Sequence, residues 1–269
     1  MNMADFLKSR KSTREFKKRN IKESELNEIK KLLNEINQEI GESAMSLSLY
    51  KYGRHVFDSL KGIGGYAGVM IDSPHYIAID IKNHSPLALV ESGYYMEKLI
   101  TDINNLGLGS CWVSLNNIEK DRKQAIFGEA SSSVEYLLAI GYAKPKNPFA
   151  QEVFSERRGV EEIIFLDELC NLVSMDTLEE RGLGDLLFYI RFAPSTKNLQ
   201  PWRFVVHNDS IELFLEEING EFYYTDAGIV MYYFEELAKN QGLNNKWEVA
   251  INPEIKNNIN YMYIGRYTF

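Results

Sequence analysis

Two stretches of the chain, far apart in sequence, follow the same order of side chains, and this likeness limits the possible folds most. Residues 92–113, SGYYMEKLITDINNLGLGSCWV, align with residues 227–249, AGIVMYYFEELAKNQGLNNKWEV. In each, a small residue begins a long apolar helix, an Asn or Gly ends it, and a strand with a Trp follows. Such a repeat predicts an internal duplication. A chance likeness between two helix–strand units is the alternative.

Helical spacing of apolar residues is clearest over residues 21–40, where Lys and Glu occupy the other face. The apolar positions are Leu26, Ile29, Leu32, Leu33 and Ile36. Gly107 and Gly242 suit the left-handed residue that ends a helix, so they mark the ends of the two repeated helices. A further helix is predicted from Leu178, followed by a loop and a strand.

Runs of β-branched and apolar residues predict buried strands at His75–Ile81, at residues 135–142 and at the end of the chain. Asn219-Gly220 is a strong signal for a two-residue turn, which predicts a hairpin between strands at residues 212–217 and 221–226.

Composition narrows the possible partners. The 269 residues carry a net charge of −8, which argues against a broad nucleic-acid footprint or binding to an anionic membrane. An anion site must therefore be built locally from a few basic residues. The 2 cysteines are too few for a disulfide framework, and no signal peptide or membrane-length apolar run is present. These features predict a cytoplasmic protein.

A basic segment, RKSTREF, precedes the helix at residues 21–40. Arg10, Lys11, Ser12 and Arg14 place three cations and a hydroxyl within five residues. Guanidinium groups and hydroxyls bind phosphate oxygens with charge-assisted hydrogen bonds, so the segment suits a phosphate. Taken alone, it fits a solvated basic face better.

The segment RFAPSTKNLQPWRF is more specific. Pro194 and Pro201 disfavour helix around them and predict a stiff loop rich in hydrogen-bond donors, which suits the polar edge of a flat heterocycle. The alternative is a plain connection between a helix and a strand. Trp202 is expected in the core in either case.

Four segments together resemble the FMN-dependent nitroreductases, and among them the TM type. RKSTREF is similar to their Arg-x-Ser-x-Arg/Lys signature, and APSTKNLQPWRF to Ala-Pro-Ser-x-x-Asn-x-Gln-Pro-Trp. NLGLGSCWV resembles their Leu-Gly-x-Gly-x-x-Trp strand entry, and IGYAKP followed by ERRGVEEII resembles a Gly-Tyr-x-x-Pro…Arg-Arg-x-x-Glu-Glu run. Singly, only the segment from Asn198 to Trp202 is specific.

The resemblance implies a nitroreductase-like α+β fold, with mixed or antiparallel sheets surrounded by helices. Nitroreductases are homodimers that bind FMN at the subunit interface. Here residues 1–165 keep the Arg-Ser signature but lack the Pro-Ser loop, and residues 166–269 keep the loop but lack the signature. The resemblance therefore implies two fused, pseudo-symmetric halves that bind one FMN per chain. Such a chain would act as a monomeric pseudo-dimer, and association of further copies is left open.

The family's cofactor-binding residues carry over to eleven positions. Arg10, Lys11, Ser12 and Arg157 would hold the phosphate and ribityl end, and Arg14 the pyrimidine edge of the flavin. Ser114 and Leu115 match a turn that presents a backbone N–H near flavin N5, although the family often has Gly or Glu-Gly there. Pro194, Ser195, Thr196 and Asn198 would contact the ring from the other half.

The activity implied is electron transfer from NADH or NADPH through FMN to nitroaromatics, quinones or similar flat small molecules. No residue is expected to act as a catalyst beside the flavin, and neither a metal, a nucleic acid nor a membrane is expected as a partner. The alternatives are a non-catalytic FMN carrier or sensor, a flavin-free scaffold, and a dehalogenation or dehydrogenation on the same fold.

Two other features suggest chemistry but do not support it. GIGGYA, residues 62–67, satisfies the dinucleotide fingerprint, yet it follows a helix-like segment instead of a strand and is expected to be a loop. Cys111 lies in an apolar strand entry and is expected to be buried. The four histidines show no metal-binding spacing.

Overall fold

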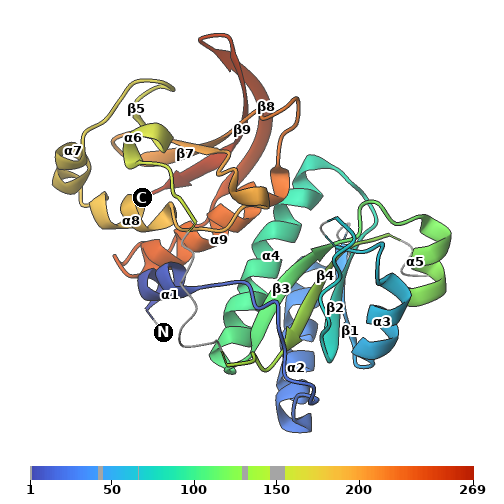
Figure 1. Ribbon diagram of the computed structural model, residues 1–269. Coiled ribbons are helices and arrows are strands. Elements are labelled where there is room, and N and C mark those ends of the chain that lie inside the picture. Colours follow the sequence, from blue (N-terminus) through green and yellow to red (C-terminus); the bar gives the residue numbers. More distant parts are fainter. Residues whose placement is uncertain (1, 42–44, 66, 129–132, 146–154) are drawn as a thin grey trace. The chain divides into compact units, whose positions relative to one another are not determined.

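A computed structural model describes residues 2–41, 45–65, 67–128, 133–145 and 155–269 (Figure 1). They divide into two units, each with its own sheet. Unit 1 comprises Met1–Arg10, Ser85–Glu97 and Glu152–Phe269, and unit 2 comprises Lys11–His84 and Lys98–Gln151. Unit 1 thus contains the whole predicted C-terminal half, residues 166–269, together with three segments that precede it. The division into two fused halves at residue 165 stays a proposal.

Unit 2 contains a four-stranded antiparallel sheet in the order β1-β2-β4-β3. Every residue of its inner strand β2 is buried, as the sequence predicts for this segment. The elements of this unit are α2 (Glu23–Ile40), β1 (Met45–Tyr50), α3 (Gly53–Leu60), β2 (His75–Ile81), the second part of α4 (Pro86–Asn105), β3 (Gly109–Ser114), α5 (Lys120–Phe127) and β4 (Val134–Gly141).

The amphipathic helix predicted from residue 21 is α2. It buries four of its five predicted apolar positions, and the fifth, Leu32, is half-buried. The basic segment that precedes α2 runs along the ends of β3 and β4. Thr13 donates its N–H to the carbonyl of Ser110 (2.8 Å), and Lys17 donates to the carbonyl of Tyr142 (2.8 Å). The sheet therefore fixes the backbone of this segment at two points.

Unit 1 contains a five-stranded sheet in the order β5-β6-β7-β9-β8. The short strand β5 runs parallel to β6, and the other pairs are antiparallel. Its elements are α1 (Met3–Ser9), the first part of α4, α6 (Val160–Ile163), β5 (Ile164–Leu166), α7 (Met175–Glu180), α8 (Gly184–Ile190), the 3-10 helix η2 (Thr196–Asn198), β6 (Trp202–Val206), β7 (Ser210–Glu216), α9 (Tyr224–Lys239), β8 (Glu248–Lys256) and β9 (Ile259–Thr268).

The two sheets share one strand order. If β5 is set aside, β6-β7-β9-β8 has the order of β1-β2-β4-β3, and a long helix precedes the third strand of each set in the chain: α4 before β3, and α9 before β8. This agreement supports the predicted duplication. In the sequence β5 crosses the predicted boundary at residue 165, and it pairs with β6 of the C-terminal half.

Within unit 1, α4 and α9 touch at two glycines that occupy matching positions in the sequence repeat. A Cβ atom at Gly93 would lie 2.0 Å from the carbonyl oxygen of Thr225, and one at Gly228 would lie 1.8 Å from that of Val90. Both distances are far below a van der Waals contact. The crossing of the two helices therefore requires glycine at both positions.

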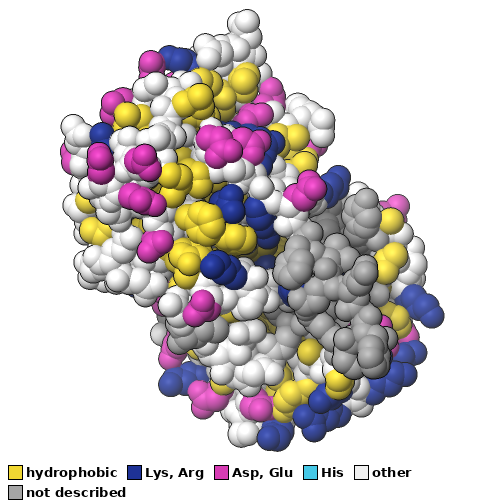
Figure 2. All heavy atoms as spheres, turned by 60° about the vertical axis from the view of Figure 1, so that its left-hand side comes forward, with side chains coloured by type: hydrophobic (Ala, Val, Ile, Leu, Met, Phe, Trp, Pro, Cys, Tyr) yellow, Lys and Arg dark blue, Asp and Glu magenta, His cyan; other side chains and the backbone are white. Residues whose placement is uncertain are grey.

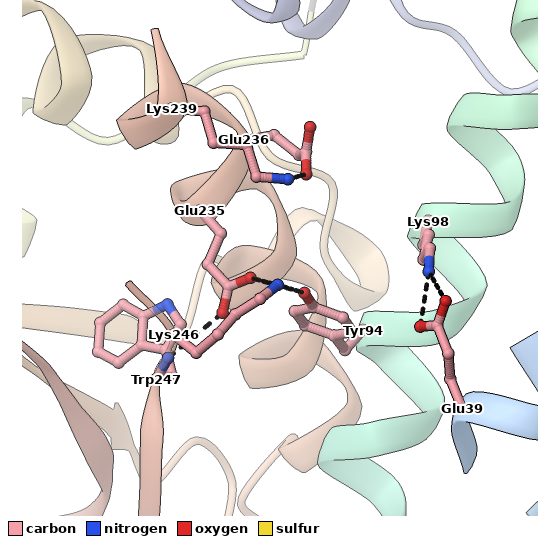
Figure 3. A network of polar contacts seen from close by, with 8 residues as sticks. All are labelled: Glu39, Tyr94, Lys98, Glu235, Glu236, Lys239, Lys246 and Trp247. Atoms are coloured by element: carbon pink, nitrogen blue, oxygen red, sulfur yellow. Dashed lines mark hydrogen bonds and ion pairs between the residues drawn. The ribbon is translucent and has the colours of Figure 1, made fainter. Parts of the chain in front are cut away.

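A buried carboxylate adds polar bonds to this packing (Figure 3). Glu235 in α9 is 3% exposed and accepts hydrogen bonds from Tyr94 Oη of α4 (2.6 Å) and from the Trp247 N–H (3.3 Å). Lys246 forms an ion pair with the same carboxylate. The group thus joins α4, α9 and the segment that enters β8. In unit 2, Lys98 bonds both carboxylate oxygens of Glu39 on α2.

Two sequence predictions about elements are wrong. The turn at Asn219-Gly220 forms as predicted, with φ of 56° and 81°, but residues 221–226 are not a strand because α9 begins at Tyr224. The hairpin partner of β7 is β6, which precedes it. The stretch predicted as one helix from Leu178 is two helices, because Gly182 takes a left-handed φ of 72° between them.

Several other expectations about segments agree with the structure. Gly107 and Gly242 follow the ends of α4 and α9 with φ of 75° and 80°. Residues 62–65 and 67 form turns after helix α3, and Tyr66 lies outside the described residues. Cys111 is buried, as expected. Across the described part of the chain, every helix is too short or too polar to cross a membrane.

Candidate functional site

The loop between α8 and β6 in unit 1 has an unusual backbone. Lys197, Asn198 and Gln200 all take left-handed φ values, of 50°, 59° and 51°. Residues with a side chain rarely adopt this region, and each costs about 1 kcal/mol or more, less for Asn. Trp202 begins β6 directly after the loop and is fully buried, as the sequence predicts. The strained loop is therefore followed directly by a strand whose residues are all buried.

Polar contacts within unit 1 hold this loop. Ser195 Oγ accepts a hydrogen bond from the Gln200 N–H (2.9 Å), which closes the loop on itself. Asn198 accepts a bond from the Arg157 guanidinium at 2.7 Å and donates one to the carbonyl of Glu156 at 2.9 Å. Arg157 also donates to the carbonyl of Ala193 (3.1 Å). Arg157 therefore bonds two residues of the loop, Ala193 near its beginning and Asn198 near its middle.

Arg157 lies in a cluster of guanidinium groups. Burial lowers its pKa, and the positive charges of Arg10 and Arg191 lower it further. Arg191 stacks over Phe188, 4.5 Å from the ring centre, and its buried Nε has no hydrogen-bond partner among the described residues. The charges of Arg10 and Arg191 thus act on Arg157 as like charges, although the whole chain carries −8. A group of like positive charges favours an anionic ligand.

One carboxylate lies against this cluster. Glu97 of α4 is fully buried and lies 3.5 Å from the Arg10 guanidinium. It also accepts a hydrogen bond from the Tyr233 hydroxyl of α9 at 2.5 Å. Burial, followed by the charge of Glu97, raises the pKa of Tyr233 well above its usual value, so this phenol stays a donor. Glu97 and Tyr233 thus help to fix the Arg10 side chain.

A phosphate group fits the residues of this cluster. Guanidinium donors bind phosphate oxygens in pairs, and the Arg191 Nε–H is a buried donor that such an anion could satisfy. Of the predicted flavin residues, unit 1 contains Arg10, Arg157, Pro194, Ser195, Thr196 and Asn198. The structure brings Arg10, Arg157 and Asn198 together through the interactions described above.

The other five predicted residues belong to unit 2, and their binding roles stay predictions. Lys11 is exposed and Ser12 half-buried, both on the segment fixed to β3. Ser114 ends β3, and Leu115 is buried. The Leu115 N–H donates to the carbonyl of Glu135 (2.9 Å).

Arg14 lines a hollow of about 800 Å³ within unit 2. Six cations and three carboxylates line it: Arg14, Lys17, Lys18, Lys51, Arg54 and Lys144, with Glu15, Glu23 and Asp72. Buried His75 also lines it but is a structural residue. Its Nε2 accepts from the Ile21 N–H (3.1 Å) and its Nδ1 bonds the carbonyl of Lys51 (2.8 Å), while burial lowers its pKa.

On the face of the molecule shown in Figure 2, basic, acidic and apolar side chains all reach the surface.

Sequence reasoning missed two residues of this site. Arg191 stands two residues before the loop motif, and its charge next to that motif was an available signal. Asp226 lies thirty positions from Thr196 and accepts hydrogen bonds from it, a pairing for which the sequence offers no signal.

The fold is α+β, with two sheets that share one strand order once β5 is set aside, and a strained loop lies beside clustered arginines. The chain belongs to the nitroreductase family described as "Putative TM nitroreductase", whose model matches residues 2–238. No curated protein is similar enough in sequence to match the chain.

Several solved structures are similar to this chain in fold. A "putative nitroreductase" from Thermotoga maritima is 18% identical, covers 98% of this chain and 94% of its own, and superposes with a TM-score of 0.58. Nitroreductase A from Vibrio parahaemolyticus is 14% identical over 70% of this chain and 86% of its own, with a TM-score of 0.50. A Bacteroides fragilis nitroreductase with bound FMN is 12% identical, covers 58% and 95%, and has a TM-score of 0.45. The Thermotoga match, over almost the whole chain, shows that the fold is nitroreductase-like.

Proposed function

We propose that the protein is an FMN-dependent oxidoreductase that accepts electrons from NADH or NADPH and passes them to nitroaromatics, quinones or similar flat acceptors. The observation that carries this proposal is the arginine cluster at Arg157 beside the strained loop. Family membership supports the reaction class, and the cluster supports a binding place for the cofactor's phosphate.

In unit 1, different residues would bind different parts of FMN. Arg10, Arg157 and Arg191 would neutralise the phosphate, with Glu97 and Tyr233 holding Arg10 in position. Each charge-assisted hydrogen bond to the phosphate is worth about 1.5–3 kcal/mol. The loop from Pro194 to Asn198 would lie against the polar edge of the ring. Its polar contacts pre-organise it, so little conformational entropy is lost on binding.

Bound FMN would supply the redox chemistry, because it accepts a hydride from the nicotinamide and returns electrons to an acceptor. The protein's own part is to hold the ring, to offset the phosphate charge and to limit access of water. We propose no side chain that itself transfers a proton or an electron.

Anaerobic reduction tests the function. The protein loaded with FMN is mixed with NADH or with NADPH, and the visible absorbance of oxidised flavin is followed. We expect one donor at least to bleach the flavin and a nitroaromatic or quinone to restore the colour. Flavin that stays oxidised with both donors would contradict the proposal and favour a non-catalytic FMN carrier. A protein that does not bind FMN would favour a flavin-free scaffold.

A further inference from the structure

Asp226 is a buried carboxylate that no part of the proposed reaction uses. It lies in the first turn of α9 and is fully buried. Its Oδ1 and Oδ2 accept a hydrogen bond from the Thr196 N–H at 3.0 and 3.1 Å, and Oδ1 also accepts from Thr196 Oγ1 at 3.1 Å. Both donors belong to one residue of the loop beside the arginine cluster.

A carboxylate in this position is costly. Among the described residues, no Lys, Arg or His forms an ion pair with Asp226, so only the neutral donors of Thr196 compensate its burial. Burial, with a smaller contribution from the charge of Glu97 on α4, raises its pKa to about 7, although the hydrogen bonds from Thr196 act to lower it. The Tyr233 hydroxyl and the Arg10 guanidinium bond the Glu97 carboxylate. Buried charges without a partner are rare, because they destabilise the fold.

The loop needs anchors of this kind. Three of its residues have left-handed backbones, a conformation that persists only where surrounding contacts impose it. Arg157 bonds Asn198 within the strained stretch, and Asp226 bonds Thr196 directly before it. Lys197, between them, is exposed and has no polar partner among the described residues. The two contacts therefore help to fix the position of the loop.

We propose that Asp226 is a positioning residue of the flavin site, which fixes the Thr196 end of the loop and so aligns the loop for the isoalloxazine ring. The inference rests on the proposed function for the identity of the ligand. The anchoring itself is a property of the chain without ligand.

Three variants separate anchoring from a general structural role. Asp226→Ala removes both acceptors. Asp226→Asn keeps one acceptor oxygen of the same shape but carries no charge. Thr196→Ala removes only the hydroxyl of an exposed residue, so it tests the contact even if Asp226→Ala fails to fold.

The first readout is trypsin cleavage after Lys197 in the protein without FMN, and the second is the dissociation constant for FMN. We expect Asp226→Ala to be cleaved several-fold faster and to bind FMN about tenfold more weakly. Asp226→Asn should match the natural protein within about threefold on both measures, and Thr196→Ala should fall between.

Unchanged cleavage and FMN affinity in Asp226→Ala, or unchanged cleavage in Thr196→Ala, would overturn the inference. The inference would also be overturned if Asp226→Asn behaved like Asp226→Ala. The negative charge of Asp226, and not its acceptor oxygen, would then be what holds the loop. If the natural protein binds no FMN, the proposed function fails and the flavin part of the inference fails with it. The rate of trypsin cleavage after Lys197 still tests whether Asp226 anchors the loop.

Discussion

The burial of one residue, Asp226, predicts how the stability of the protein depends on pH. Its pKa rises from 3.8 in the unfolded chain to about 7 in the fold. Between these values the folded protein holds a proton that the unfolded chain has lost, so the free energy of unfolding falls as pH rises from about 4 to about 7. The loss is about 4 kcal/mol at most, and it is complete above pH 7.

Urea unfolding of the FMN-free protein checks this, with Asp226→Asn as the reference, since other titrating groups cancel in the comparison. We expect the stability of the Asn variant relative to the natural protein to increase as pH rises from about 4.5 to about 8. A difference that does not change with pH would show that the carboxylate titrates normally.

Single residues also show how far sequence reasoning extends. Arg10, Arg157 and Asn198 are found from motifs because each sits in a short segment with a recognisable composition. Asp226 is not found, because its importance depends on α9 beginning next to a loop about thirty residues earlier in the chain. The hydrogen bond of the Leu115 N–H is not found either, because it depends on the pairing of β3 with β4.

At the scale of helices and strands, the crossing of α4 and α9 makes the sharpest prediction. Gly228→Ala places a methyl group against the carbonyl of Val90, and because backbone cannot move aside cheaply we expect a loss of about 1–3 kcal/mol in stability. Gly93→Ala should act similarly against Thr225. Thermal or urea unfolding measures both.

Leu87→Ala is the control, since Leu87 lies in the first turn of α4 and is 46% exposed. It should change stability by about 0.5 kcal/mol or less. A Gly228→Ala variant as stable as this control would mean that the two helices do not cross at the glycines.

Among the helices and strands, the sequence predicts the type of a segment best where the pattern of apolar residues follows burial. The periodicity of α2 and the apolar run of β2 predict their type, because burial alone dictates those patterns. Residues 221–226 failed because three aromatic residues favour a strand locally, while packing of the following residues onto α4 favours an early start to α9. The repeat marked Gly93 and Gly228 as equivalent, but their contact required the fold.

For the whole molecule, the shared strand order of the two sheets is what the sequence repeat anticipates. The sequence repeat does not predict which segments make up each unit. In the structure, α1 and the start of α4 belong to the same unit as the C-terminal sheet. Such grouping depends on contacts between residues far apart in sequence, and local patterns contain no information about it. The same holds for β5, three residues long, which pairs in parallel with β6.

A titration of the FMN-free protein with FMN tests the central claim most directly, because it counts sites and measures their affinity together. Arg157→Ala is compared with Arg54→Ala, which removes an exposed arginine paired with Asp58 on α3. We predict one FMN per chain, with binding at least tenfold weaker in Arg157→Ala and unchanged in Arg54→Ala. Two equivalent sites per chain, or equal affinity in the two variants, would contradict the account.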